Sequence, residues 1–371
     1  MINFLRALLR YISYILTLVA VGLYLLAAMA PYIPPARIEL VALMGMFFPF
    51  FLGGMILATL YWILRLNWRM LLALMAVYAL SWGSLSAYFP INRSATHEVL
   101  SKQGEAKPLK VLSYNVCAFG FARHSVRKPN RCLLYLRSSE ADIICLQEAL
   151  TAGDSQWGVT EEQIKAYLGG KYPYIETIAA QGGGSRLMIL SRYPISEGER
   201  IDIDSRANGA AAWTVDIEGR PTKVINLHLE SFRLPPSTGE EYMKLVAEGE
   251  GFALKDAMQS RLGPVFLQHN YQANRIHEYI TKTGSERTIV CGDFNDTPVS
   301  YAVGKIGKGL TNAFTKAGNG LGISFRSRYF RVRIDHILVG AAFTPLLTEV
   351  DVSARGSDHY PIYTYILDKE G

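Results

Sequence analysis

The sequence predicts an α+β protein in which a layered sandwich of strands and helices follows three membrane spans. Three observations lead to this prediction. Long uncharged apolar stretches are found in residues 1–89. After them, short apolar runs typical of buried strands alternate with segments of helical period. The alternation is only partial and strands predominate, which favours an α+β sandwich over a doubly wound parallel sheet.

Three apolar stretches near the N-terminus are each long enough to cross a ~30 Å hydrocarbon core as a helix. They are Tyr11–Ala30, Leu40–Leu64 and Met70–Phe89. Pro49 and the pair Gly53–Gly54 predict a kink in the second stretch, which membrane helices tolerate. A cleaved signal peptide ending at Ala27–Ala30 is the alternative for the first, but its apolar run is long and two more spans follow. We therefore expect residues 1–89 to anchor the protein in the lipid bilayer.

Positive charges beside the spans predict their orientation. Arg6 and Arg10 precede the first span, and Arg65 and Arg69 lie between the second and the third. The opposite side has Arg37 in the first loop and a few scattered basic residues after the third span. Basic flanks favour the cytoplasmic side. With three spans, the C-terminal domain is then expected to be extracytoplasmic.

The charge balance limits the classes of partner. The formal net charge is +6, but residues 1–94 contain six Lys or Arg and one acid, which leaves 32 basic and 31 acidic residues in the rest. A nearly neutral soluble part gives no support for a broad nucleic-acid-binding surface, although a local basic patch is compatible with it. The cysteines have no Cys-x-x-Cys metal spacing and do not argue for a disulfide. They are Cys117, Cys132, Cys145 and Cys291.

The soluble domain is expected to span residues 109–371, after a polar, non-periodic linker over residues 90–108. Apolar runs that end at Gly, Pro or polar residues predict its strands. In chain order these are Leu109–Val116, Ala141–Ala149, Arg186–Ile195, Ala210–Ile217, Thr222–Glu230, Thr288–Cys291, Val332–Gly340 and Tyr360–Leu367. Helices are predicted at Asn130–Glu140, at Glu161–Gly170 with a glycine stop, and over residues 240–281.

Polar residues end or interrupt most of the predicted strands. They are Asn115, Glu148, His228, Asp293, Asn295, Asp335, Asp358 and His359. Each one alone has an ordinary explanation as a cap, a turn residue or a satisfied core histidine. Together they match the needs of a hard, oxygen-binding divalent cation and a phosphate. The chain has no His/Cys zinc spacing, no Gly-x-Ser-x-Gly elbow and no P-loop.

The segment VCGDFNDTPVSY, from Val290 to Tyr301, is the clearest example. Asp293 and Asn295 are two residues apart, so they point to the same face of an extended backbone. A carboxylate and an amide at the end of a core strand are costly unless the site needs them.

Seven motifs, in this order along the chain, resemble the endonuclease/exonuclease/phosphatase superfamily. They are SYNV, DIICLQE, LMILSRYPI, NLHLES, GDFNDTP, RIDHILV and SDHYPI. The superfamily includes deoxyribonucleases, apurinic endonucleases, inositol-polyphosphate 5-phosphatases and neutral sphingomyelinases. The resemblance covers residues 109–368 but not the spans. It implies a four-layer αββα sandwich of two packed β-sheets flanked by helices, and a metal-dependent hydrolase of phosphoester bonds.

The resemblance also implies the metal site. Glu148 would be the principal Mg²⁺ ligand, with Asn115 and Asp358 close to the metal. Mn²⁺ is a possible substitute for Mg²⁺. In-line attack on a phosphoester requires such a cation to neutralise charge that grows on the phosphoryl oxygens.

Catalytic roles follow from the same resemblance. Asp293 would orient or deprotonate the attacking water, and Asn295 would hold a phosphate oxygen. His359 would contact the scissile phosphate and would itself be held by Asp335. His228 matches an additional active-site histidine of the deoxyribonuclease and sphingomyelinase branches.

Several other residues are expected to be structural. His336 directly follows Asp335, and adjacent strand residues face opposite sides of a sheet, so His336 is expected to face away from the site. Four histidines without a motif context are expected to be ordinary surface or helix residues. They are His97, His124, His269 and His277. The glycines of residues 182–184 favour a plain turn over a loop that approaches the substrate.

The sequence is compatible with three hypotheses for function and substrate. The first is a membrane-anchored phosphodiesterase or phosphatase acting on lipid head groups or small phosphoesters, in which Phe232–His269 is either a lid or, as we favour, an ordinary packed helix. The second is an envelope nuclease on DNA or RNA that uses the four arginines of Phe325–Arg333. The third is a non-catalytic binding module, which the complete polar set disfavours. No protein partner is predicted.

Overall fold

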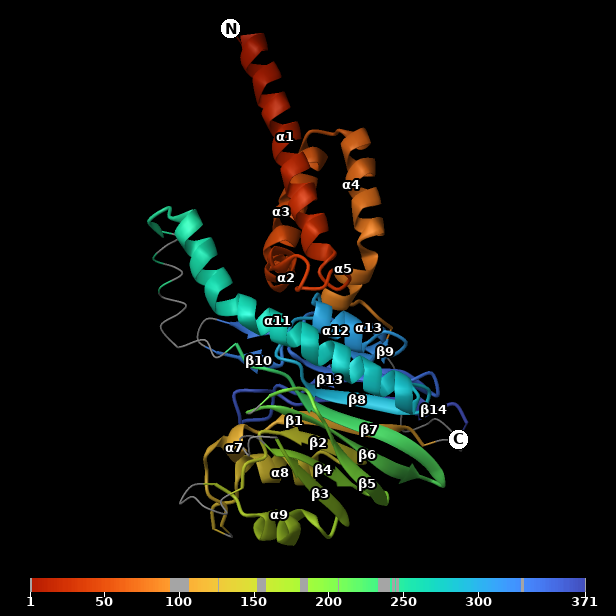
Figure 1. Ribbon diagram of the computed structural model, residues 1–371. Helices are drawn as coiled ribbons and strands as arrows, with labels where there is room; N and C mark the ends of the chain where they lie inside the picture. Colours follow the sequence, from red (N-terminus) through yellow and green to blue (C-terminus); the bar gives the residue numbers. More distant parts are fainter. Residues whose placement is uncertain are drawn as a thin grey trace.

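The computed structural model describes residues 2–93, 107–125, 127–151, 158–180, 186–205, 207–232, 241, 244, 247–327 and 330–370. A bundle of apolar helices stands on one face of a two-sheet domain (Figure 1). The bundle contains α1 (Ile2–Ala28), α2 (Glu39–Met46), α3 (Phe48–Leu64), α4 (Trp68–Leu80) and α5 (Trp82–Tyr88).

One segment of the bundle, Phe4–Ala28, is long and apolar enough to cross a membrane by itself. The pair α2 and α3 is bent by 69° and the pair α4 and α5 by 72°, so the chain has up to three spans if each bent pair is one span. The predicted kink in the second stretch occurs at Phe47, just before Pro49, where proline fits the first turn of α3. Gly53 and Gly54 lie inside the unbroken helix α3.

The domain contains two mixed six-stranded sheets. The first has the order β13 (Phe343–Val350), β14 (Ile362–Asp368), β1 (Leu109–Asn115), β2 (Ile143–Gln147), β4 (Arg186–Ser191) and β3 (Tyr174–Ala179). The second has the order β5 (Ile195–Ile201), β6 (Gly209–Ile217), β7 (Arg220–His228), β8 (Thr288–Asp293), β12 (Asp335–Val339) and β9 (Thr311–Asn312). Only the pairs β1–β2 and β7–β8 are parallel among the described strands.

The sheets pack face to face, and helices cover their outer faces (Figure 1). Trp213, Ile143 and Ile289 are fully buried in the core between the sheets. α8 (Arg131–Ser138) and α9 (Glu161–Leu168) cover the first sheet, and α11 (Gly251–Thr283) and α12 (Tyr301–Ile306) cover the second. The predicted four-layer αββα sandwich is confirmed. Short elements complete the domain: α7 (Cys117–Gly120), α13 (Ala313–Ala317), β10 (Phe325–Arg326) and β11 (Arg331–Val332).

Several strands differ from the sequence prediction. The stretch 186–195, predicted as one strand, is divided between sheets: β4 ends at Ser191, and Pro194 precedes β5 in the other sheet. The prediction also omitted β3, β13 and all but the first residue of β5. The exposed residues of β3 and β5 hide the apolar alternation on which such a prediction depends. α11 begins at Gly251 and contains Pro264.

Candidate active site

The polar residues predicted from the strand ends gather at one edge of the sandwich, where α7 leaves β1. Asn115 and His228 are the last residues of β1 and β7, and Glu148 directly follows β2. Asp293 ends β8 beside His228, and Asp335 begins β12 directly opposite Asp293. The two parallel strand pairs, one in each sheet, therefore direct their carboxyl ends to the same place.

Asn115 joins the two sheets at this edge. Its side chain is buried, and its amide nitrogen donates to Glu148 Oε1 at 3.1 Å and to Asp293 Oδ2 at 3.0 Å. Its amide oxygen accepts from the backbone N–H of Cys117 at 3.0 Å. Because Cys117 occupies the amide oxygen, the two amide hydrogens of Asn115 point toward the carboxylates of Glu148 and Asp293 and position both carboxylates.

His359 lies between two buried carboxylates. Its Nδ1 donates to Asp335 Oδ2 at 2.9 Å, and its Nε2 is 3.6 Å from Asp293 Oδ2. The Phe325 ring covers the imidazole, with the ring centres 4.9 Å apart. The possible ligand atoms of Asp293, Asp335 and His359 lie within 4.8 Å of one another, so these residues could also hold a metal ion.

His228 approaches the same carboxylate from another side. Its Nε2 is 3.6 Å from Asp293 Oδ2 and 3.8 Å from Glu148 Oε1. Its Nδ1 has no hydrogen-bond partner among the described residues.

Burial and charge set the protonation states of this group. Burial raises the pKa of Asp293, and the histidines beside it only partly oppose that effect. Burial lowers the pKa of His228, against the attraction of Asp293. Burial alone would also lower the pKa of His359. The carboxylates of Asp335 and Asp293 outweigh this effect and raise the pKa to about 10. His359 is therefore an imidazolium at neutral pH, whereas His228 is neutral.

Glu148 and Asp358 form the exposed side of the site. The Glu148 side chain is 33% exposed, and Asp358 is exposed to solvent. Both carboxylates lie near Cys117: burial and then the charges of Asp358 and Glu148 raise the pKa of the Cys117 thiol to about 12. Oxygen donors with excess negative charge and access to water suit a hard cation that retains several waters, such as Mg²⁺.

The backbone at GDFN has constraints of its own. Gly292 has φ +148°, and a Cβ at this position would lie 1.9 Å from the backbone oxygen of Leu227, so only glycine fits. Asn295 has φ +48°, and its N–H donates to Asp293 Oδ1 at 2.8 Å. Its amide nitrogen donates to the backbone oxygen of Leu229 at 3.0 Å. Asn295 is half-buried at the rim of the site.

Three supporting residues were missed from the sequence. Gln147 and Asn226 are fully buried and form a hydrogen bond between the two sheets at 2.7 Å, directly behind Glu148. Ser357 donates to the backbone oxygen of Asn115 at 2.8 Å and accepts from the N–H of His359 at 3.1 Å. Gln147, Asn226 and Ser357 lie inside the motifs DIICLQE, NLHLES and SDHYPI, but nothing in those motifs identifies their hydrogen-bond partners.

The remaining histidines fall in different places. His336 is fully buried and points away from the site, with Nε2 3.1 Å from the backbone oxygen of Asp296. His269 is a helix residue as expected, but it is not an ordinary surface one: it is buried and pairs with Asp296 Oδ2 at 3.1 Å. His124 and His277 are half-buried. His97 and the glycines of residues 182–184 lie outside the described residues.

The arginine-rich segment before Asp335 differs from the prediction. Arg326 and Arg331 are exposed on the hairpin β10–β11, but Arg333 is buried and contacts the helical bundle. Arg333 is therefore not available to a nucleic-acid backbone. Arg328 lies outside the described residues.

Comparison with known families identifies the domain. A model described as the endonuclease/exonuclease/phosphatase family matches residues 112–359. The chain belongs to this family. The predicted enzyme class, a hydrolase of phosphoester bonds, is thereby confirmed. A second model, described as a domain of unknown function, matches residues 9–88. A comparison with curated proteins gave no match.

Solved structures of family members resemble the chain at low identity. A family protein from Bacteroides vulgatus is 16% identical, with coverage of 70% of this chain and 98% of that one and a TM-score of 0.48. A mannosyl-6-phosphatase from Bacteroides thetaiotaomicron is 17% identical, with coverage of 70% and 99% and a TM-score of 0.46. TDP2 from D. rerio, in complex with a single-strand DNA product, is 18% identical, with coverage of 70% and 98% and a TM-score of 0.44.

Proposed function

We propose that the protein is a membrane-anchored, Mg²⁺-dependent phosphodiesterase or phosphatase that attacks phosphorus with an activated water. One observation carries this proposal. Asp293 is buried between His228 and His359, and Asn115 links it to the half-exposed carboxylate of Glu148. A base, a cationic donor and a hard-cation ligand therefore lie at one edge of the fold.

Glu148 would hold the metal, with Asp358 close to it on the exposed side. When bound, Mg²⁺ would supply positive charge against the phosphoryl oxygens. Asn115 would act as a positioning residue, because its amide nitrogen rather than its oxygen faces Glu148. The buried cluster of Asp293, Asp335 and His359 suits Mg²⁺ less well, because a cation there would replace the His359–Asp335 hydrogen bond and would retain few waters.

Asp293 would accept the proton of the attacking water. A carboxylate whose pKa burial raises is a better base near neutral pH than an exposed one. His359 would donate to a non-bridging oxygen from Nε2, since Asp335 holds Nδ1 and keeps the ring charged. Neutral His228 would orient the water or the leaving group. Asn295, at the rim, would contact a phosphate oxygen.

Lipid head groups and small phosphoesters are the substrates we favour. The nearly neutral domain and the apolar helix Phe4–Ala28 support action at a membrane surface. A nuclease is the second candidate, because the exposed Arg326 and Arg331 are on a hairpin whose Phe325 packs on His359. Arg333 is buried against the bundle and cannot contact a nucleic-acid backbone, which weakens the nuclease candidate.

We further propose a three-span topology with the catalytic domain outside the cytoplasm. Arg65 lies in the loop between α3 and α4 and Arg69 in the first turn of α4, at the end of the bundle that is distant from the domain (Figure 1). A periplasmic-type reporter fused after residue 371 should be active, and the same reporter fused after residue 66 should be inactive. The reverse pattern would overturn the topology.

The substrate proposal is tested with the full chain in lipid nanodiscs. Release of phosphate or of phosphorylated head groups from phospholipids is measured beside hydrolysis of small phosphoesters and nicking of plasmid DNA. We expect phosphoester turnover that changes little with salt. Plasmid nicking that falls steeply with salt, without lipid turnover, would favour the nuclease instead.

A further inference from the structure

Two chain segments that carry carboxylates of the proposed site also contact the helical bundle. One runs from Asp293 at the end of β8 to Val299. The other runs from Arg333 to Asp335 at the start of β12. The backbone N–H of Phe294 donates to the oxygen of Ile334 at 2.9 Å, so the two segments are tied to each other as well.

Val299 belongs to the core of the bundle rather than to that of the domain. It is fully buried and packs in a cluster with residues of α1, α2, α3 and α4, including Tyr24, Met44 and Phe48. Gly45 of α2 lies directly against it: a Cβ on Gly45 would be 2.6 Å from the backbone oxygen of Val299 and 2.4 Å from the Cβ of Ala30. The contact has no room for an added methyl group.

Arg333 makes the second connection. It is 3% exposed, and no carboxylate pairs with it among the residues that the structure describes. Its guanidinium donates to the backbone oxygens of Ala87 and Tyr88, the latter at 3.5 Å, and to that of Leu321 at 2.8 Å. It also stacks on the Phe314 ring, 4.1 Å from the ring centre.

The residues Ala87 and Tyr88 form the end of α5. Carbonyl groups in the last turn of a helix have no partner inside the helix and carry partial negative charge. They therefore accept hydrogen bonds from a buried cation that no acid among the described residues neutralises. If the bundle shifted, the guanidinium would be left buried without these partners, which is strongly unfavourable.

The connection reaches the site within a few residues. Arg333 is two residues before Asp335, which holds His359, and Val299 is six residues after Asp293. A displacement of the bundle would therefore move both carboxylates that contact His359. Asn92 closes the same interface from the bundle side, since its amide donates to the backbone oxygens of Thr315 and Gly318 at 3.0 and 2.6 Å.

We infer that the helical bundle is part of the framework of the active site and not only an anchor, with Val299 and Arg333 as positioning residues. The bundle holds the two segments in place, and they hold Asp293, Asp335 and His359. The activity measurement for this inference depends on the proposed function. A structural measurement tests it independently.

The first test compares two glycine substitutions inside the bundle of the full-length protein in detergent. Gly45→Ala places a methyl group against Val299, whereas Gly53→Ala in α3 places it in open space. With bis(p-nitrophenyl) phosphate as substrate, we expect Gly45→Ala to lower kcat at least about tenfold, with KM within about twofold of the wild type, because misplaced catalytic groups affect the turnover step. Gly53→Ala should match the wild type.

Hydrogen–deuterium exchange supplies the readout that does not need activity. In Gly45→Ala, exchange should increase in residues 294–300 and 334–339, and in Gly53→Ala it should not. If Gly45→Ala and Gly53→Ala behave alike in both measurements, the inference is wrong. If the wild type hydrolyses nothing, the proposed function fails, and the exchange data alone decide the inference.

The second test addresses Arg333. We expect Arg333→Met to lower kcat without a change in KM, and Arg333→Lys, which retains a donor for the α5 carbonyls, to restore part of the loss. Arg200→Met, at an exposed position on β5 outside the proposed site, is the matched control. Full kcat in a folded Arg333→Met protein would overturn the role of Arg333. If that variant does not fold, the comparison of Gly45→Ala with Gly53→Ala decides.

Discussion

The side-chain amide of Asn115 donates a hydrogen bond to Asp293 at 3.0 Å and so joins the ends of β1 and β8 across the two sheets. The same amide donates to Glu148 at 3.1 Å. One residue thus fixes the spacing between the carboxylate proposed to bind the metal and the carboxylate proposed to activate water.

Replacement of this amide tests its positioning role. In Asn115→Ala, Oδ2 of the buried Asp293 loses its amide donor and is left with only the two histidines beside it, so the free energy of unfolding should decrease by about 1–3 kcal/mol. Hydrolysis should decrease much more than stability, since both carboxylates lose their common support. Thermal unfolding and initial rates measure the two effects. An Asn115→Ala enzyme with normal turnover would show that the link between the sheets is dispensable.

The ion pair of His359 with Asp335 predicts a pH dependence. The pKa of His359 is raised to about 10 in the fold, above the value of ~6.5 for a free histidine. The ion pair therefore contributes its full stabilisation below about pH 6.5, and this stabilisation is lost as the pH rises toward about 10.

Melting temperatures across this range should accordingly decrease on the alkaline side in the wild type. In Asp335→Asn the pKa of His359 should be lower, because the carboxylate that raises it is gone, and the alkaline decrease should become smaller. Identical profiles for the two proteins would contradict the ion pair.

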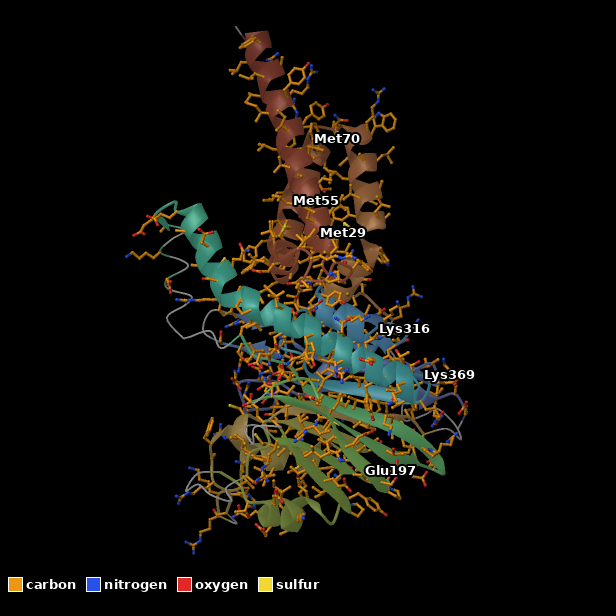
Figure 2. The ribbon with its side chains drawn as sticks, in the orientation of Figure 1. Met29, Met55, Met70, Glu197, Lys316 and Lys369 are labelled. Carbon is orange, nitrogen blue, oxygen red and sulfur yellow. The ribbon has the colours of Figure 1, made fainter. Side chains whose placement is uncertain are left out.

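Glu148→Gln tests the metal ligand. An amide oxygen is a weaker ligand than a carboxylate for a hard cation, so Mg²⁺ affinity should decrease by more than about tenfold. Calorimetric titration of the full chain measures this affinity. Glu197 is the matched control, because it is exposed on the outer strand β5 (Figure 2) and Glu197→Gln should leave the affinity unchanged. Equal affinities in the two variants would place the metal elsewhere, with the cluster of Asp293, Asp335 and His359 as the next candidate.

The hydrogen bond between Gln147 and Asn226 predicts a coupled pair. Gln147→Leu removes the donor to the buried Asn226 Oδ1 and should cost about 1–3 kcal/mol of unfolding free energy. The double substitution with Asn226→Leu should cost less than the sum of the single ones, because no buried amide is then left without its partner. Denaturation of the four proteins completes the cycle. Strict additivity would mean that the two amides do not interact.

Much of this fold could be predicted because its strands are buried on both faces. Runs such as Ile143–Gln147 and Thr288–Asp293 are continuous and apolar, and abrupt polar residues mark their ends. Strands β3 and β5 were missed because their exposed residues follow no such pattern. The turn at Pro194 falls inside the predicted strand Arg186–Ile195, because nothing local indicates that the chain changes sheets there.

The site was predictable in its members but not in its geometry. The order of the motifs identified Asp293 and His359 as site residues. Their separation along the chain does not predict that His359 Nε2 lies 3.6 Å from Asp293 Oδ2. The role of Arg333 depends on carbonyl oxygens at the end of α5, about 245 residues earlier in the chain. Such a contact has no sequence signal, because any residue supplies a carbonyl.

The most direct test of the account is metal-dependent turnover by the full-length protein in detergent, in the wild type, Asp293→Asn and Glu197→Gln. Asp293→Asn retains the shape of the side chain but removes the proposed base. With Mg²⁺ and a panel of activated phosphomonoesters and phosphodiesters, we predict turnover in the wild type and in Glu197→Gln. Turnover should stop on chelation of the metal and should be lost in Asp293→Asn. Turnover that persists with the chelator, or that Asp293→Asn retains in full, would contradict the proposed site.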